Sequence, residues 1–414
     1  MSLTRRIGIP IVKGIVWTLR RVDHYFLGSS ALRADADFRR DPYPSFEAIR
    51  HAPIVRSLAN RGWIILGYEA VQEALRDTNL SNDLNNNPFY LRVARAASGG
   101  RPIPFVDNPP LLNLDPPAHT PLRRAISRRL TRGFVDALTP QIEDSARALV
   151  SRMVPPCDLI ETLAEPLPVQ VIADILGVHN TDQLAQWSHR MTNALRIAEA
   201  DQVQDAADAE ASMRCFVAKQ LPDMLKINPE SPISQLAQDP EVQERDVIST
   251  CVLLLTAGHE TTTRLIANAI YILHHQRSVR EAVVSGNLSL DNLIDEVLRL
   301  EPPVQMTLRF VRRRTTIAGR SLKPGQLVLI NFAAANRDPA VFDNADRFEP
   351  GRNRPHLSFG YGIHLCLGAA LAKLEARIAI KELLVTYPDF ELHEPISWGN
   401  NQFFRGPETL TILT

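Results

Sequence analysis

The sequence predicts a mainly α-helical fold with a minor β-sheet region. Apolar residues recur at helical spacing through most of the chain from Pro117 onwards, and the longest such run extends from about Glu244 to His275. Strand-like segments occur in only two places, near residues 53–66 and after residue 304. The sequence contains no internal repeat, flexible linker or low-complexity tract. We therefore expect a single domain over residues 1–414.

The composition allows a large core and gives no sign of a charged partner. Of the 414 residues 45% are hydrophobic, and 46 basic residues balance 46 acidic ones. This balance gives no indication of nucleic-acid binding. The four cysteines are far apart and form no CxxC pair: Cys157, Cys215, Cys251 and Cys366. Because this spacing fits neither a zinc site nor a disulfide framework, we expect a reducing compartment, the cytoplasm.

Residues 1–35 are expected to form an N-terminal extension. The stretch from Ile7 to Trp17 is apolar, but Pro10 and Lys13 interrupt it. A membrane-spanning helix needs about 20 mainly apolar residues, so this stretch is too short, and no small-residue cleavage site follows it. A helix that docks on the surface of the protein or of a membrane remains as the alternative, and no membrane span is expected.

The first half of the chain predicts a hairpin, a long loop and then helices. Residues 53–66 form two strand-like runs around the turn Asn60-Arg61-Gly62. Residues 80–112 are irregular, and loops of that length in a compact protein are usually functional or disordered. Thr139 is a plausible N-cap with Pro140 in the first helical position.

The second half predicts a buried central helix and a C-terminal sheet. Residues 251–255 in the middle of the 244–275 helix are apolar on every side, which is typical of a buried helix. Lys323-Pro324-Gly325 predicts a turn into a strand over residues 326–330. A last helix is expected around residues 367–386, followed by a small sheet within 390–414.

The most informative segment is FGYGIHLCLG, from Phe359 to Gly368. Its two glycines spaced by one residue allow tight turns and a close approach of the backbone to a flat group. Cys366 directly precedes an apolar-periodic helix, whose first amides and dipole would favour a thiolate. A thiolate held in this way suits a haem iron as an electron-donating axial ligand. A dinucleotide site is not supported, because Leu365 occupies the position of the third glycine in GxGxxG.

This segment resembles the haem-binding signature FGxGxHxCxG of the cytochromes P450, the haem-thiolate monooxygenases, and further motifs extend the resemblance over nearly the whole chain. The resemblance implies a triangular helical prism around a buried haem b. It also implies that Cys366 binds the iron, that Phe359, Gly360 and Gly368 shape the haem site, and that His364 lies near a propionate. The implied activity is the insertion of one oxygen atom from dioxygen into a substrate.

The central helix contains Ala257-Gly258-His259-Glu260-Thr261-Thr262. A zinc-protease HExxH motif would need a histidine where Thr263 stands, so that interpretation fails. A threonine here can bond back to a carbonyl of the previous turn and open the helix locally. The resemblance implies that Glu260 and Thr261 border bound dioxygen and relay protons to it, with Ala257 and Gly258 leaving space beside the haem. Thr262 remains as an alternative hydroxyl.

Two further motifs contain charged residues. His119 and Arg123 lie four apart, on one face of a helix. The resemblance implies that they bind one haem propionate and that Arg309 meets the other, for which the planar donors of arginine are suited. Glu296 and Arg299 correspond to the family's ExxR motif, joined by Arg347, and we interpret this trio as structural, because breaking a buried charge network is costly.

Apolar residues from four segments are candidates for a substrate pocket, although each is equally compatible with the core. They are Phe89, Tyr90, Ile103, Phe105, Leu253, Leu254, Val304, Met306, Leu308, Phe403 and Phe404. They predict an apolar small-molecule substrate. Three arginines of the irregular loop could meet a substrate carboxylate, but solvent exposure is the more ordinary outcome: Arg92, Arg95 and Arg101.

Electrons are expected from a separate protein, because the sequence shows no flavin- or nicotinamide-binding domain. A small acidic ferredoxin, with its reductase, would be attracted by cations on the cysteine side. These are Arg124, Arg128, Arg129, Arg352, Arg354 and Lys373. A peroxide-driven peroxygenase is disfavoured by Glu260 and Thr261, and nothing favours a non-catalytic haem sensor. A monomer is expected.

Overall fold

The computed structural model describes residues 36–57, 62–88, 91–92, 95, 102–193, 200–399 and 401–413. The proposed docking segment 1–35 and the residues Phe89, Tyr90 and Arg101 lie outside these described residues.

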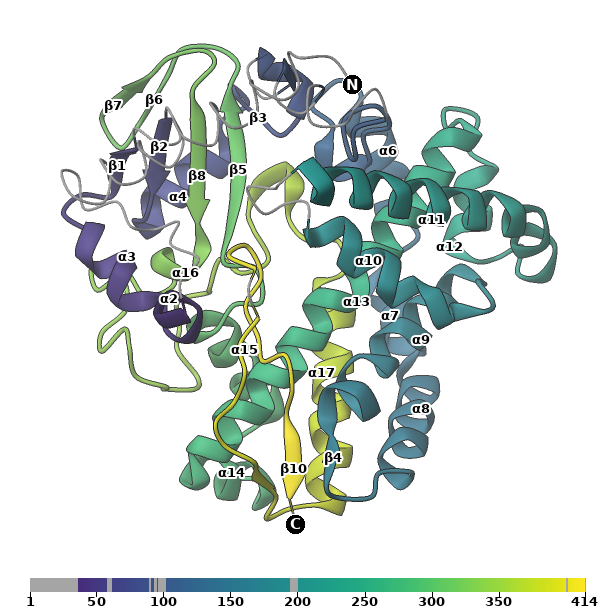
Figure 1. Ribbon diagram of the computed structural model, residues 1–414, viewed down its shortest axis with the longest axis vertical. Helices are drawn as coiled ribbons and strands as arrows, with labels where there is room; N and C mark the ends of the chain where they lie inside the picture. Colours follow the sequence, from purple (N-terminus) through teal and green to yellow (C-terminus); the bar gives the residue numbers. More distant parts are fainter. Residues whose placement is uncertain are drawn as a thin grey trace.

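Helices form most of the described chain (Figure 1). The α-helices are α2 (Ala36–Arg40), α3 (Tyr43–Ile49), α4 (Tyr68–Arg76), α6 (His119–Ser127), α7 (Arg132–Ala137), α8 (Thr139–Ser151), α9 (Pro166–Leu176), α10 (Leu184–Asn193), α11 (Ala200–Ile227), α12 (Pro232–Ala237), α13 (Glu244–His275), α14 (Arg277–Val284), α15 (Leu290–Leu300), α16 (Phe332–Ala335) and α17 (Ala369–Thr386). Short turns of 3₁₀-helix are η2 (Leu84–Asn86), η3 (Leu111–Asn113), η5 (Thr181–Gln183) and η6 (Gly362–His364), and η4 (Ile160–Ala164) is a π-helix.

The strands form small sheets at two ends of the molecule (Figure 1). They are β1 (Ile54–Ser57), β2 (Gly62–Ile65), β3 (Leu80–Ser81), β4 (Cys157–Asp158), β5 (Met306–Val311), β6 (Thr315–Ile317), β7 (Arg320–Leu322), β8 (Leu327–Asn331), β9 (Glu391–Leu392) and β10 (Thr411–Leu413). The larger sheet has the order β1-β2-β8-β5-β3, and only its β2–β8 pair is parallel. A second sheet has the order β4-β10-β9, and β6 pairs with β7. The mainly helical class with a minor sheet region is confirmed.

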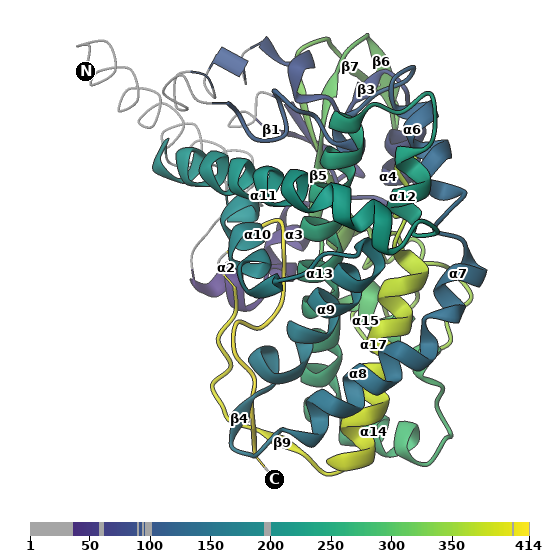
Figure 2. The ribbon, with the colours of Figure 1, turned by 90° about the vertical axis from the view of Figure 1, so that its right-hand side faces the viewer.

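Helix α13 extends through the centre of the helical part, as its sequence predicts (Figures 1 and 2). It begins with a capping box between Gln243 and Asp246 and packs against α9, α10, α11 and α17. Leu253 and Leu254 remain half-buried although their neighbours are buried, so the middle of the helix has one accessible side. This side of α13 is available to a ligand.

The two strands pair with Ile54 opposite Ile65, as predicted. Asn60 and Arg61 of the expected turn lie outside the described residues, and Gly62 is the first residue of β2. The start of α8 differs from the prediction by one residue. Thr139 is the first residue of the helix, and its hydroxyl donates a hydrogen bond to the Asp136 carbonyl at 2.8 Å. The reason is that α7 ends directly before it, so Leu138 already has helical dihedral angles.

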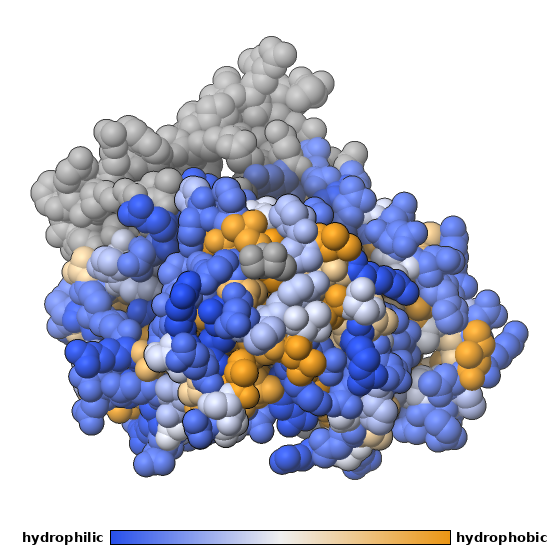
Figure 3. Space-filling view, turned by 90° about the horizontal axis from the view of Figure 1, so that it is seen from below, coloured by the Kyte–Doolittle hydropathy of each residue, from blue (hydrophilic) through white to orange (hydrophobic). Residues whose placement is uncertain are grey.

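The hydrophobic core has its largest cluster among the helices, and separate clusters lie beneath the larger sheet. No helix within the described ranges combines the length and apolar character that crossing a membrane requires. On the face shown in Figure 3, apolar residues form small groups separated by hydrophilic ones.

Candidate active site

The segment before α17 folds into a tight loop around Cys366. The Cys366 amide donates to the Phe359 carbonyl at 2.8 Å, and the Leu365 amide donates to the Gly362 carbonyl at 3.1 Å. Gly362 has φ +73°, and a Cβ at this position would lie 2.8 Å from the Leu75 carbonyl oxygen. Only glycine fits there, because of both its backbone conformation and this contact with the end of α4. The glycines therefore close the loop and hold Cys366 at the start of α17.

The Cys366 thiol is accessible, yet the surrounding protein desolvates it. A thiol that lines a hollow in the molecule is both accessible and desolvated. Desolvation raises the pKa of Cys366, while the Gly368 amide and the positive charge of Arg123 act in the opposite direction. A donor amide and a nearby cation stabilise a thiolate in such a hollow, and a thiolate is a strong ligand for iron.

Basic side chains from three segments gather near this loop. The rings of His119 on α6 and His364 on η6 have centroids 4.5 Å apart. Arg123, one turn after His119, donates to the Leu365 carbonyl at 2.6 Å and so joins α6 to the loop. Arg309 on β5 is buried, and its guanidinium donates to the Asn82 side chain at 2.9 Å. We call His119, Arg123, Arg309 and His364 the basic cluster.

The positive charges of the basic cluster belong to its two arginines, which oppose protonation of His364. Desolvation, together with Arg309, His119 and Arg123, lowers the pKa of His364 to about 3. Burial lowers the pKa of Arg309 to about 10, and Asp115 opposes this shift. The Nε2 atom of His119 is buried without a hydrogen-bond partner. Buried groups of this kind are costly unless an anion balances them, so the cluster suits a ligand with carboxylates.

On helix α13 the predicted acid, Glu260, is buried, whereas the predicted alcohol, Thr261, is half-buried. The Thr261 hydroxyl donates to the Ala257 carbonyl at 2.9 Å, and Ala257 is exposed. Glu260 is buried and pairs with Arg264, one turn later, at 2.9 Å. Its second oxygen, Oε2, is buried without a hydrogen-bond partner. One carboxylate oxygen is therefore fixed by Arg264, and the other remains unpaired.

Gly258 does not lie on the same side as Ala257. A Cβ on Gly258 would lie 3.4 Å from Ile172 of α9, so the missing side chain allows α9 to pack closely. Successive residues of a helix point about 100° apart, so Gly258 faces α9 while Ala257 is exposed. The expected role of Gly258 in leaving space beside the haem stays a prediction.

Comparisons with known proteins identify the family of this chain. The cytochrome P450 family profile matches residues 288–395. The cytochrome P450 monooxygenase PikC of Streptomyces venezuelae is 33% identical over 394 residues, which cover 91% of this chain and 92% of that protein.

The chain belongs to the cytochrome P450 family.

Solved P450 structures share the fold over nearly all of their length. The ligand-free structure of CYP164A2 from Mycobacterium smegmatis has a TM-score of 0.83 and 29% identity, covering 97% of this chain and 100% of that one. P450BioI in complex with an acyl carrier protein ligated to hexadec-9Z-enoic acid has a TM-score of 0.83 and 30% identity, covering 91% and 99%. The present protein is thus an oxidoreductase of the P450 monooxygenase type, and its family implies a haem cofactor.

The ExxR motif of this P450 forms a closed buried network. Arg299 donates to both carboxylate oxygens of Glu296, at 2.8 and 2.9 Å. It also donates to the backbone carbonyls of Asn336, Ala345 and Arg347, at 2.7–2.8 Å. These bonds fix the segment that leads to the cysteine loop.

The third side chain of the ExxR network is that of Arg352 and not that of the predicted Arg347. Arg347 contributes only its backbone carbonyl to Arg299, and its side chain is exposed. The cation beside Glu296 is Arg352, whose Nε donates to Glu296 Oε1 at 3.1 Å. Arg352 takes this place because the path of the loop brings its guanidinium to Glu296. Arg352 therefore belongs to this network and not to the expected redox-partner face.

Of the candidate pocket residues, six are only partly buried: Phe105, Leu253, Leu254, Val304, Leu308 and Phe404. Ile103 is buried. Met306 and Phe403 are buried in a hydrophobic cluster with Phe46 and Leu66, where they contribute to packing. Val304 and Phe404 face each other in an isolated β-bridge.

Most of the cations expected on the partner face have partners within the chain. Arg129 pairs with Asp239, Arg354 with Glu69 and Lys373 with Asp295. Arg124 on α6 and Arg128, the residue that caps the C-terminal end of α6, are exposed. Because Arg123 joins α6 to the Leu365 carbonyl, these two arginines lie on or directly after a helix next to the cysteine loop.

Sequence reasoning missed Asn82, which binds Arg309, and Arg264, which binds Glu260. The i, i+4 spacing of Glu260 and Arg264 is a signal that could have identified that pair. Asn82 follows the two-residue strand β3, and the sequence around it has no comparable pattern.

Proposed function

We propose that this P450 uses dioxygen to oxidise an apolar small molecule at a haem b held by Cys366. The observation that supports this most is the pairing of an accessible, amide-stabilised thiol with the basic cluster. Cys366 would bind the iron, with Phe359, Gly360 and Gly368 shaping the loop beneath it. His119, Arg123, Arg309 and His364 would bind the two propionates. Bound haem supplies the iron at which dioxygen is activated.

The proposed proton path begins at Glu260. Its Oε1 is anchored by Arg264, and its Oε2 is free to hold a proton. The next hydroxyl in the chain is that of Thr261, which hydrogen-bonds to the carbonyl of Ala257 on the accessible side of α13. We assign Oε2 as the proton donor and Thr261 Oγ1 as the group that passes the proton on.

The substrate is proposed to contact the partly buried apolar residues Phe105, Leu253, Leu254, Val304 and Phe404. Phe89 and Tyr90, outside the described residues, and the buried Met306 and Phe403 complete the set of candidates. P450BioI, a relative of similar fold, was solved with a carrier protein ligated to hexadec-9Z-enoic acid, a fatty acid with a long apolar chain. An apolar substrate agrees with both observations.

A separate ferredoxin, reduced by its reductase, is proposed as the electron donor. It would bind next to the cysteine loop, where Arg124 and Arg128 are exposed and the side chain of Ile363 is 44% accessible. Opposite charge would accelerate encounter, so the rate of reduction should fall as salt rises. We further propose a cytoplasmic monomer with one domain.

The assignment of Cys366 is tested by the spectrum of the reduced, carbon-monoxide-bound protein. The parent should show the red-shifted band of thiolate-ligated haem, and Cys366→His should lose it while still binding haem. Cys251→Ser is the matched control, because Cys251 is buried in α13 without a proposed ligand role. A Cys366→His variant that keeps the thiolate band would refute the proposal.

The proton path is tested by comparing two neighbouring threonines. Thr261 and Thr262 both bond back to carbonyls at 2.9 Å, but Thr262 is buried. Thr261→Ala should lower product formed per electron consumed about tenfold or more, and peroxide should rise. Thr262→Ala should leave this ratio unchanged. Equal ratios in both variants and the parent would exclude the assigned role of Thr261.

A further inference from the structure

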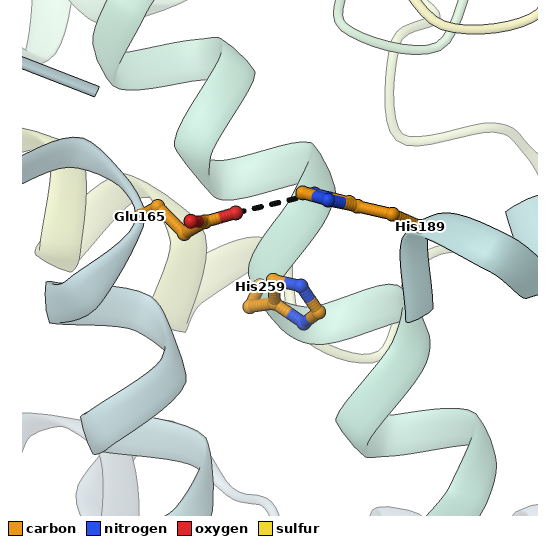
Figure 4. Close-up of side chains that lie close together, drawn as sticks. All are labelled: Glu165, His189 and His259. Atoms are coloured by element: carbon orange, nitrogen blue, oxygen red, sulfur yellow. Dashed lines mark ion pairs between the residues drawn. The ribbon is translucent and has the colours of Figure 1, made fainter. Parts of the chain in front are cut away.

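A group of side chains beside α13 is separate from the basic cluster. Glu165 at the η4–α9 junction, His189 on α10 and His259 on α13 place their ligand atoms within 4.8 Å of one another. Figure 4 shows Glu165 and His189 approaching from opposite sides, with the His259 ring beside them. The His189 Nε2 and Glu165 Oε1 atoms are 3.1 Å apart.

The orientation of His259 suits a metal ligand. The ring is 1% exposed, and its Nδ1 lies 2.7 Å from the Leu255 carbonyl oxygen. Because a carbonyl only accepts hydrogen bonds, Nδ1 carries the proton and Nε2 has a free lone pair. Nε2 is buried without a hydrogen-bond partner. Histidines that bind metals usually donate their other N–H to a carbonyl or carboxylate in this way.

Glu165 and His189 complete a complementary ligand set. The π-turn at η4 places Glu165, whose amide donates to the Ile160 carbonyl at 3.0 Å. The side chain of His189 is 46% exposed and that of Glu165 is 26% exposed. Two of the three side chains therefore border solvent beside the buried Nε2 of His259.

We propose that Glu165, His189 and His259 form a binding site for a zinc-class divalent cation. Two imidazole nitrogens and one carboxylate oxygen are a common ligand set for Zn²⁺, with water in the remaining position. Ligand bonds of about 2.0–2.2 Å require a small contraction, which the accessible side chains of His189 and Glu165 allow. This ion would join η4, α10 and α13 and stabilise their contacts. The site does not depend on the proposed substrate or electron donor.

Another group of potential metal ligands can be compared with this site. His274, His275 and Glu394 also lie within reach of one another. His274 already has the side chain of Glu391 at 3.2 Å from its Nδ1, and His275 and Glu394 are exposed. None of these three side chains has a buried nitrogen or oxygen without a partner, as His259 does. We therefore expect weaker zinc binding at this second group.

The test measures zinc and iron together in the untagged holoenzyme. The protein is equilibrated with buffered zinc, dialysed and analysed for both metals, so that haem iron counts the molecules. We expect about one zinc per iron in the parent. His189→Gln and Glu165→Gln should weaken zinc binding at least about 100-fold, because losing a ligand costs no less than losing a supporting contact. His275→Gln should retain the zinc.

Two measurements separate loss of the site from loss of the fold. The carbon-monoxide spectrum of the holoenzyme should be the same in the parent, His189→Gln and Glu165→Gln. Added zinc should raise the Tm of the parent and of His275→Gln, but not of His189→Gln. Absence of zinc from the parent, retention of zinc by folded His189→Gln, or loss of zinc in His275→Gln would overturn the proposal.

Discussion

Two groups of ionisable residues in this P450 differ in how completely their buried polar atoms are satisfied. In the ExxR network, the guanidinium of Arg299 has a carboxylate on one side and three backbone carbonyls on the other. Glu296 accepts further hydrogen bonds from the Glu349 amide and from Arg352. Every charge of this network therefore has an opposite charge or a dipole in contact with it.

The basic cluster has the opposite character. Its neighbouring carboxylate, Asp115, also binds the Asn82 amide at 3.1 Å and lies 3.8 Å from Arg312. Burial and mutual repulsion hold the pKa of His364 near 3, and His119 keeps a buried atom without a partner. This difference separates residues that hold the fold together from residues prepared for an anionic ligand. Each of the following experiments tests that distinction.

The largest effect is expected from Glu296→Ala. Removing the carboxylate leaves Arg299 buried with an uncompensated charge, which should lower the free energy of unfolding by about 3–5 kcal/mol. Denaturant titration of the purified holoenzyme measures this change. Glu296→Gln keeps an acceptor and the volume of the side chain, so it should cost less. A cost below about 1 kcal/mol for the alanine variant would contradict a structural role for the network.

Glu210 on α11 is an intermediate case, a buried carboxyl with few partners. Burial raises its pKa to about 7, although Arg214 and the Phe105 amide oppose the shift. The folded chain thus keeps this proton at pH values where the unfolded chain has lost it, and stability falls as pH rises from about 4.5 to about 7.

The Glu210→Gln variant should lack this part of the pH dependence. Near pH 4.5 the free energy of unfolding of this variant should equal that of the parent. At pH 8 it should be higher than that of the parent by at most about 3 kcal/mol. Urea titrations at both pH values measure the difference. Exposed Glu241→Gln is the control and should follow the parent. A parallel pH profile for Glu210→Gln and the parent would show that Glu210 does not titrate in this range.

A feature of this protein could be predicted from the sequence where residues close together in the chain determine it. The bounds of α13 follow from a local period of 3.6 and a local cap, and they match the structure. The cysteine loop follows from glycines whose constraint acts on their own backbone. These features could be predicted because neighbouring residues determine them.

Features that depend on the path of a loop or on a distant helix were missed or corrected. Arg347 and Arg352 are equally plausible partners for Glu296 until the course of residues 345–352 is known. The contact between Gly258 and Ile172 depends on α9, which is far away in sequence. Glu165, His189 and His259 come from three elements and share no local pattern. Such contacts are set by packing, which a single sequence does not display.

Arg309→Gln tests the basic cluster as a ligand site. Hydrogen bonds to charged groups contribute about 1.5–3 kcal/mol, so loss of the guanidinium should speed haem loss about 10- to 100-fold. Transfer of haem to an excess of an acceptor protein measures the rate. Arg312→Gln, an exposed arginine of the same region, is the control and should leave haem loss unchanged. Equal rates for the two variants would exclude Arg309 from haem binding.

The smallest effect distinguishes the two arginines beside the ExxR network. Arg347 donates nothing to Glu296 and offers only its carbonyl, which alanine also has, so Arg347→Ala should change the free energy of unfolding by no more than about 0.5 kcal/mol. Arg352 donates its Nε to the carboxylate and further donors to the Asp343 and Asn344 carbonyls. Arg352→Ala should therefore cost about 1–2 kcal/mol. Denaturant titrations of the two variants in parallel provide the measurement, and the reverse order would restore Arg347 as the third member of the network.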